Sequence, residues 1–189
     1  MLFLVLLAVF VFVIELRILR YAYRKIGVPP RYMFLVMVLT LLGSQVNIPL
    51  YETAAGRGTT VVAINVGGAL VPLLLSLYLF VRMGMRGRML VGVAVVAAIV
   101  HSLARIVPGV GIAVPMLVPP IVAAAVSLVL ALRRAPAVAY VSGSMGTLIG
   151  ADILNLPRIA ELGAPVVSIG GAGTFDGVFL TGIIAGLIA

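Results

Sequence analysis

The sequence predicts an all-α, polytopic integral membrane protein with about seven transmembrane helices in a 3+1+3 parallel-repeat arrangement. Three observations predict this class. The 189 residues are 63% hydrophobic and only 10% charged, the apolar residues form long runs, and two pairs of short motifs recur in the same order. A soluble domain averages about 25% charged residues. A chain this poor in charge could not cover its surface in water, whereas a bilayer would accept it.

The apolar runs divide the chain into candidate spans. A transmembrane helix needs roughly 20 apolar residues. The segments that meet this need are 2–21, 32–50, 60–81, 89–107, 110–132, 137–157 and 165–189. Basic residues follow the first run instead of preceding it, so we interpret it as a retained span and not as a signal peptide.

The basic residues predict the orientation of these spans. Ten of the 13 Lys and Arg residues fall in alternate loops on one side. They are Arg17, Arg20, Arg24, Lys25, Arg31, Arg82, Arg86, Arg88, Arg133 and Arg134. Because basic loops stay in the cytoplasm, we expect an N-terminus outside the cell membrane and a cytoplasmic C-terminus. The net charge of +8 then reflects topology, and we expect no nucleic-acid partner.

Two motif pairs predict an internal repeat. Residues 43–50 resemble 150–158, and residues 61–69 resemble 166–172. An offset of four spans makes the two halves parallel. The resulting single membrane domain has a first repeat at 1–84, a linking helix at 85–108 and a second repeat at 109–189.

Broken helices are expected near 47–49 and 155–157, where Asn47 precedes Pro49 and Asn155 precedes Pro157. Proline removes a backbone donor and disturbs the preceding turn. Interruptions at corresponding places in two repeats point to a transport site. The alternative is ordinary helix-end chemistry, in which the asparagine amides satisfy the freed backbone groups.

A third break is expected at 170–176. Gly170, Gly171 and Gly173 weaken a helix, and Thr174 could cap a new one beside Asp176. Unwound backbone at membrane depth is tolerated where it lines a cavity. Close packing of helices through glycine is the alternative, and the sequence favours neither.

Two aspartates are the strongest candidates for a functional site. A charge inside a bilayer costs roughly 3 kcal/mol, so Asp152 and Asp176 need a reason to be there. We expect the two aspartates at similar depth in the membrane, on adjacent antiparallel helices. The alternative is that Asp152 lies at a water-exposed outer helix end and that Asp176 caps a helix, which would explain both residues without a function. Further candidate binding residues are Asn65, His101 and Arg105, of which His101 and Arg105 are expected on one face of the fourth span.

The same segments carry a family resemblance. The runs Gly-Ala-Asp-Ile-Leu-Asn-Leu-Pro at 150–157 and Ser-Ile-Gly-Gly-Ala-Gly-Thr-Phe-Asp-Gly at 168–177 resemble the DUF1614 family of prokaryotic membrane proteins. The segments at 46–50, 65–68 and 107–112 resemble it too. The resemblance implies a polytopic membrane protein and no established activity.

Three functions remain open. The first is a small transporter or channel-like protein whose polar site is formed by Asn47, Asn155, Asp152 and Asp176. The second is an intramembrane aspartyl hydrolase in which the two aspartates share a proton. The approach to Asp176 is similar to the GxGD intramembrane proteases, except that Thr-Phe separates the last glycine from the aspartate. The third is a non-catalytic membrane scaffold.

The expected partners are the lipid bilayer and an unknown polar solute, ion or membrane peptide. The sequence offers one histidine, no cysteine and few carboxylates, with no metal-ligand spacing. No nucleotide-binding loop is present. We therefore expect no metal and no cofactor, and the oligomeric state stays open.

Overall fold

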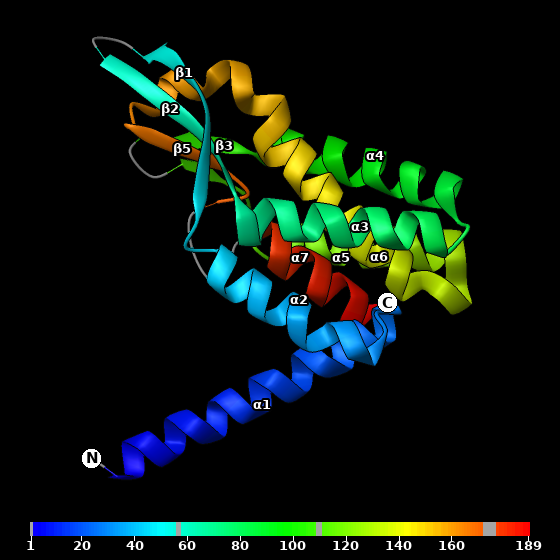
Figure 1. The fold of residues 1–189 in the computed structure, drawn as a ribbon. Helices are drawn as coiled ribbons and strands as arrows, with labels where there is room; N and C mark the ends of the chain where they lie inside the picture. The colour runs from blue at the N-terminus through cyan, green and yellow to red at the C-terminus, as the bar shows by residue number, and fades with distance from the viewer. Residues whose placement is uncertain (1, 56–57, 109–110, 172–176) are drawn as a thin grey trace.

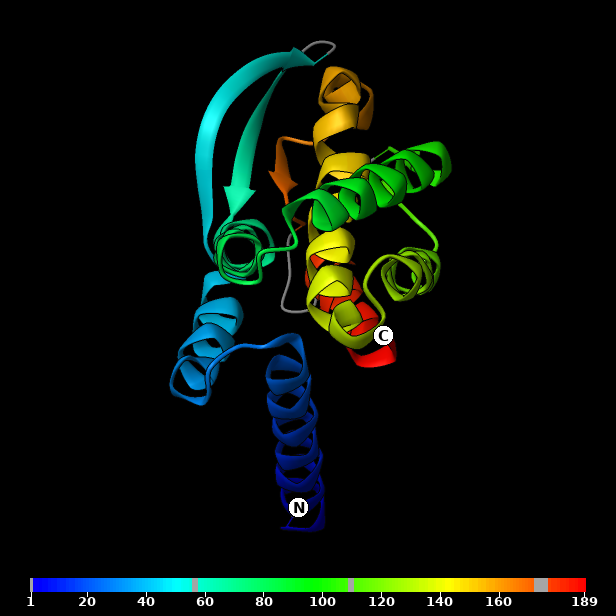
Figure 2. The same ribbon diagram turned by 90° about the vertical axis from the view of Figure 1, so that its right-hand side faces the viewer.

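The computed structural model describes residues 2–55, 58–108, 111–171 and 177–189, most of which are helical. The helices are α1 (Leu2–Ile26), α2 (Pro30–Gly43), α3 (Val71–Arg82), α4 (Arg86–Leu103), α5 (Val118–Ala131), α6 (Ala135–Thr147) and α7 (Gly177–Ile188). The strands are β1 (Asn47–Ala55), β2 (Gly58–Asn65), β3 (Arg105–Val107), β4 (Gly111–Ala113) and β5 (Val166–Ile169). A helix bundle carries two small sheets at one end (Figure 1 and Figure 2).

Two helical segments in the described part of the chain are long and apolar enough to cross a membrane, by length and composition. They are Arg86–Leu103, with 18 residues and a hydropathy of 1.5, and Val118–Arg158, with 41 residues and a hydropathy of 1.8. The second includes both α5 and α6, which pack side by side. Leu132, with a φ of 36°, turns the chain between them.

Helix α6 forms the centre of the bundle. Every residue from Ala135 to Thr147 is buried except Pro136, and α4, α5 and α7 pack around it. Glycines allow this approach: a Cβ at Gly146 would lie 2.6 Å from the Val96 side chain of α4, and one at Gly182 of α7 would lie 3.0 Å from the Tyr140 ring. Small residues thus form the helix contacts.

The prediction of an all-α chain is wrong, because the described residues include two sheets. One has the strand order β1-β2-β5, and the other pairs β3 with β4. Strand β1 pairs antiparallel with β2, and β2 pairs parallel with β5. The strands β2 and β5 are rich in valine and isoleucine, which fit a pleated surface. Their apolar runs were included in the predicted spans 60–81 and 165–189, since hydropathy does not separate a buried strand from a helix.

The predicted helix break at Asn47 and Pro49 is also wrong, because both residues lie in β1. Helix α2 has already ended at Gly43, and the register of β1 shifts between Pro49 and Tyr51. Proline is tolerated in a strand at such an irregularity. The predicted span 32–50 is therefore a 14-residue helix followed by a strand.

The second predicted break corresponds to a real change in helix geometry. After α6, residues Leu148–Asp152 form a π-helical segment and Ile153–Leu162 a 3-10 segment that contains Pro157. Asn47 and Asn155 consequently occupy different structures, so the first motif pair is not matched in three dimensions.

The other motif pair forms a direct contact. Residues 61–64 of β2 and 166–169 of β5 are neighbours in register, with Val61 opposite Val166 and Ile64 opposite Ile169. The Gly-Gly segments that follow the two strands also touch, because a Cβ at Gly170 would lie 2.7 Å from the backbone nitrogen of Ala69. The first segment is part of the π-helical segment Val66–Leu70, and the second is a turn.

The end of the bundle opposite the sheets joins several helix termini. Lys25 Nζ, near the end of α1, donates a hydrogen bond of 2.7 Å to the carbonyl of Leu187 at the end of α7. A Cβ at Gly186 would lie 2.7 Å from Ile26. The ends of α1 and α7 therefore lie together, far from β1, β2 and β5 (Figure 1).

Candidate functional site

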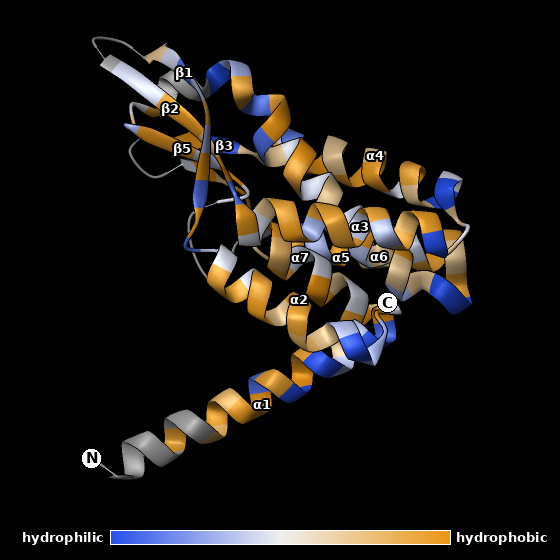
Figure 3. Cartoon of the chain, in the orientation of Figure 1, coloured by the Kyte–Doolittle hydropathy of each residue, from blue (hydrophilic) through white to orange (hydrophobic). Residues whose placement is uncertain are grey.

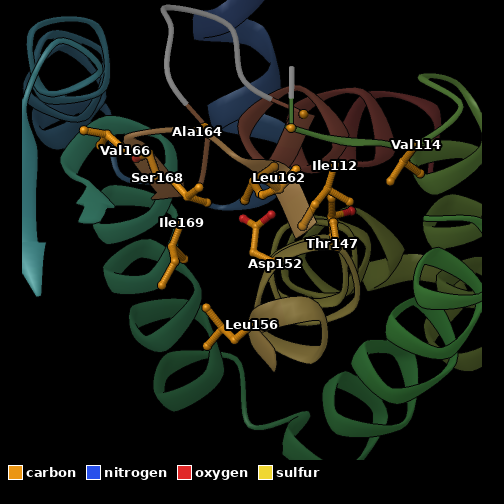
Figure 4. A pocket seen from close by; sticks show the side chains of 16 residues that line it. Ile112, Val114, Thr147, Asp152, Leu156, Leu162, Ala164, Val166, Ser168 and Ile169 are labelled. Atoms are coloured by element: carbon orange, nitrogen blue, oxygen red, sulfur yellow. The ribbon is translucent and has the colours of Figure 1, made fainter. Parts of the chain in front are cut away.

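A cavity of about 400 Å³ lies where the bundle meets the sheets. Its walls come from the end of α6, from β4, from β5 and from the start of α7. The residues that line it include Ile112, Thr147, Asp152, Ser168, Ile169 and Gly177. Figure 4 shows Asp152 between the β5 side chains on one side and Ile112 with Thr147 on the other.

Asp152 joins the central helix to the sheet. It ends the π-helical segment and is half-buried, and its Oδ2 accepts a hydrogen bond of 2.7 Å from the backbone N–H of Gly170. This bond brings the Asp152 carboxyl group to the end of β5, because Gly170 directly follows Ile169, the last residue of that strand.

Thr147 lies beside Asp152 in the cavity wall. It is only 5% exposed, and its hydroxyl has no hydrogen-bond partner among the described residues. The π-helical hydrogen bonds of the intervening segment connect residues five apart, which is the spacing from Thr147 to Asp152. A buried hydroxyl without a partner is costly, and such groups call for an explanation.

A second polar cluster holds the sheet to the start of α3. Asn65 is fully buried and caps the π-helical segment Val66–Leu70, accepting a bond of 2.7 Å from the Gly68 N–H. Its Nδ2 donates to the Ser44 carbonyl at 2.9 Å and to Asn47 Oδ1 at 3.0 Å. Ser168 Oγ donates to the same Asn47 oxygen at 2.6 Å.

Asn155 satisfies backbone groups of its own helix. Its Nδ2 donates to the carbonyls of Ala151 at 2.8 Å and Gly150 at 3.1 Å. The same nitrogen lies 3.4 Å from His101 Nδ1 on α4. These bonds use the Asn155 amide within its own helical segment, and the cavity wall does not include this residue.

His101 and Arg105 do not share a helix face. Helix α4 ends at Leu103, and Arg105 begins β3. The residues Ile106 and Val107 are β-branched, and the proline that follows them favours extended backbone before it. These properties outweigh the apolar run that predicted a longer fourth span.

The glycine-rich segment is only partly described. Gly170 and Gly171 form a turn outside any helix, with φ angles of +83° and +73°. The predicted break in a helix is wrong for these two residues, because the segment before them is strand β5 and not a helix. Gly173, Thr174 and Asp176 lie outside the described residues. Gly177, the next residue after Asp176, lines the cavity with Asp152.

The site residues predicted from sequence therefore form separate groups. Asn47 and Asn65 belong to one network, Asn155 and His101 to another, and Asp152 lines the cavity. The prediction missed Thr147 and Ser168. Thr147 had a detectable signal, since it lies five residues before the aspartate in an otherwise apolar run. In the described residues, no three or more His, Cys, Asp or Glu side chains form a group that could hold a metal ion.

The comparison with protein families agrees with the motifs quoted from the sequence. The model described as "Protein of unknown function (DUF1614)" matches residues 9–188. The chain belongs to the DUF1614 family. No curated protein and no solved structure matches it. Both the cavity and the two polar clusters of this DUF1614 chain lie within the matched region, so its chemistry has to be argued from these residues.

Proposed function

We propose that the chain is an integral membrane protein that crosses the bilayer seven times, with α1 to α7 as its spans. Large apolar side chains point outward from several helices: Phe34 is 71% exposed, Leu74 63% and Val129 84%. Exposed apolar surface of this extent is a liability in water, and it fits a lipid environment. Figure 3 shows hydrophobic residues along the helices of the bundle, with hydrophilic residues concentrated toward its two ends.

The two ends support an orientation with the sheets outside. Helices α3 and α4 are joined near Arg82 and Arg86, and α5 and α6 are joined through Arg133 and Arg134. These turns lie at the end opposite the sheets (Figure 1). By the positive-inside rule, that end is cytoplasmic, which gives the N-out, C-in topology and places the cavity toward the outer face.

Cysteine labelling tests this topology, because the chain has no cysteine of its own. We expect a cysteine at the exposed Glu52 of β1 to react with a membrane-impermeant maleimide in intact cells. A cysteine at the exposed Arg134 should react only after the membrane is opened. The reverse pattern, or labelling of both sites in intact cells, would overturn the orientation.

The parallel pairing of β2 with β5 also supports the two-repeat organisation. Each strand is followed by a Gly-Gly pair and later by a helix, α3 in one case and α7 in the other, although the first pair lies in a π-helical segment and the second in a turn. The proposed halves are 1–84 and 109–189, with 85–108 as the linking helix.

The role that fits this architecture best is a small transporter or channel-like protein with a binding site for a polar solute or cation. The cavity that contains Asp152 carries this proposal. It combines a fixed carboxylate with the buried hydroxyl of Thr147 and the half-buried Ser168 side chain. An ionisable residue inside the membrane is by default a functional candidate.

An Asp152→Asn variant tests the transport role. We expect purified wild-type protein in liposomes to give currents on a solid-supported membrane with at least one of sodium, potassium, ammonium or choline. Asparagine keeps an oxygen for the Gly170 N–H but removes the charge, so the current should fall about tenfold or more. Glu52→Gln, which neutralises an exposed carboxylate on β1, is the control and should leave it unchanged. Equal currents for wild type and Asp152→Asn would reject the site.

The second candidate function, an aspartyl hydrolase, is supported by the position of Gly177. Because this residue lines the cavity, Asp176 immediately precedes a part of its wall. Two carboxylates in contact would share a proton and activate water. In the same preparations, the hydrolase predicts cleavage of a membrane-embedded peptide that Asp152→Asn and Asp176→Asn both abolish. Full cleavage by either variant excludes it, and a scaffold predicts that neither variant changes any activity.

A further inference from the structure

Strand β5 has an open edge in the described part of the fold. The sheet order β1-β2-β5 places β5 at one border, bonded only to β2. All four of its residues, Val166–Ile169, line the cavity. An edge strand presents unpaired N–H and C=O groups and can accept a further strand.

The hydrogen-bond register shows which groups of β5 face away from β2. Val61 N–H bonds to the carbonyl of Pro165 at 2.9 Å. In a parallel pair, the N–H and C=O of one residue point to the same side and successive residues alternate. Residues 165, 167 and 169 therefore face β2, and the N–H groups of Val166 and Ser168 point to the opposite side.

The hydrogen bond of the Gly170 N–H shows what the side of β5 opposite β2 faces. Gly170 N–H points the same way as those of Val166 and Ser168, and its acceptor is Asp152 Oδ2. Asp152 lines the cavity, so the open edge of β5 is directed into the cavity.

The wall opposite β5 includes two residues of β4, Gly111 and Ile112, whereas the partner strand β3 does not line the cavity. Strand β4 bonds only to β3 among the described strands. The cavity thus lies between β5 of one sheet and β4 of the other.

We propose that this cavity binds an extended peptide segment, which adds as a strand to the edge of β5 and faces β4. This proposal concerns the same cavity and goes beyond the transport function proposed for it. Backbone bonds supply the affinity in this mode of recognition, and side-chain pockets supply the specificity. The wall at β5 consists of Val166, Val167 and Ile169 with one polar residue, Ser168, and it favours apolar or β-branched peptide residues.

The Asp152 carboxylate at one end of the β5 edge gives the site a preference for a positively charged group on the peptide. The Asp152 carboxylate lies immediately beyond β5, at the Gly170 N–H. An ammonium group at that end of the bound segment is attracted by the carboxylate. The preferred ligand is an extended apolar peptide with a lysine or a free amino terminus at the Asp152 end.

Binding of a defined peptide to the full-length protein in nanodiscs tests this. The probe is a fluorescent six-residue peptide of alternating valine and threonine with one lysine, placed at either end in two versions. We expect one version to bind, and N-methylation of alternate backbone amides to weaken binding about tenfold or more. On binding, hydrogen exchange should slow at the amides of Val166 and Ser168, with no change at Val167.

Two variants at one position separate backbone from side-chain recognition. Val166→Pro removes an N–H that faces the cavity and leaves the bonds to β2 in place. Val166→Ala keeps that N–H and shortens the side chain. We expect at least a tenfold loss of peptide binding for proline and a change of about threefold or less for alanine. Equal binding by both variants, or no effect of N-methylation, would overturn strand addition.

The outcome is separable from that of the transport proposal. If neither peptide binds at about 1 mM while cation currents still require Asp152, the inference fails and the transporter stands. If the peptide binds with the expected amide protection and no current appears, the ligand assignment stands and transport is rejected.

Discussion

Replacing Gly68 with alanine should strongly lower the stability of the fold. A Cβ at this position would overlap the carbonyl oxygen of Gly170 and would lie 3.3 Å from Asn65 Oδ1. The overlap is with the backbone of Gly170, where the π-helical segment Val66–Leu70 meets the turn after β5, so no side chain can rotate away. Overpacking typically costs 1–3 kcal/mol, and we expect the upper part of that range, about 3 kcal/mol, because two chain segments must separate. The measurement is the thermal unfolding midpoint of the detergent-solubilised protein.

Gly87→Ala is the matched control for this prediction. Gly87 lies in the first turn of α4, is exposed, and a Cβ there would meet nothing within 4 Å. Alanine is favoured over glycine in a helix by up to about 1 kcal/mol, so this variant should unfold at the same temperature or higher. A Gly68→Ala protein as stable as Gly87→Ala would show that Gly68 and the Gly170 backbone are not in close contact.

The apolar runs of the sequence predicted most of the helices but misassigned their ends. The run at 60–81 contains β2, a π-helical segment and α3 in succession. Each of these buries apolar side chains, and hydropathy alone reports burial and not backbone geometry. The information that separates them is local: β-branched residues occupy β2, and the helical part begins only after the Asn65 cap.

The similarity between two motifs of the sequence corresponds to a contact in the structure, but it did not predict that this contact is between strands. The match between 61–64 and 166–169 was interpreted as two equivalent helices, whereas these residues are neighbouring parallel strands. Parallel strands buried on both faces show continuous apolar runs, as transmembrane helices do. The partner of a strand depends on tertiary structure, so no pattern within either segment predicts it.

The candidate site was predictable only at its charged residue. Asp152 was selected because a carboxylate in an apolar run is expensive, and the structure places it in a cavity wall. Ser168 is an ordinary residue in the sequence, and the five-residue spacing of Thr147 from Asp152 gains a meaning only in a π-helical segment. They became relevant through the π-helical turn and the edge of β5, which bring them to the same cavity. The asparagines were selected for the same polarity, but Asn65 and Asn155 make bonds to backbone groups.

Asn65→Ala gives the second large effect. The Asn65 side chain, fully buried, makes three hydrogen bonds, to the Gly68 N–H, the Ser44 carbonyl and Asn47 Oδ1. Alanine would leave a buried N–H and a carbonyl without partners, and each such group costs about 1–3 kcal/mol. We expect a loss of about 2–4 kcal/mol, measured as a lower unfolding midpoint and as faster exchange of the Gly68 amide.

Asn47→Ala is the control that shows whether the loss at Asn65 comes from its burial or only from its amide group. Asn47 carries the same amide group and accepts bonds from Asn65 and Ser168, but it is exposed. Water can replace its bonds, so the loss should stay near 1 kcal/mol. Equal destabilisation by the two substitutions would mean that water also reaches Asn65. In that case Asn65 would be available to a ligand, as the sequence originally suggested, and would not act only as the cap that connects β2 to α3.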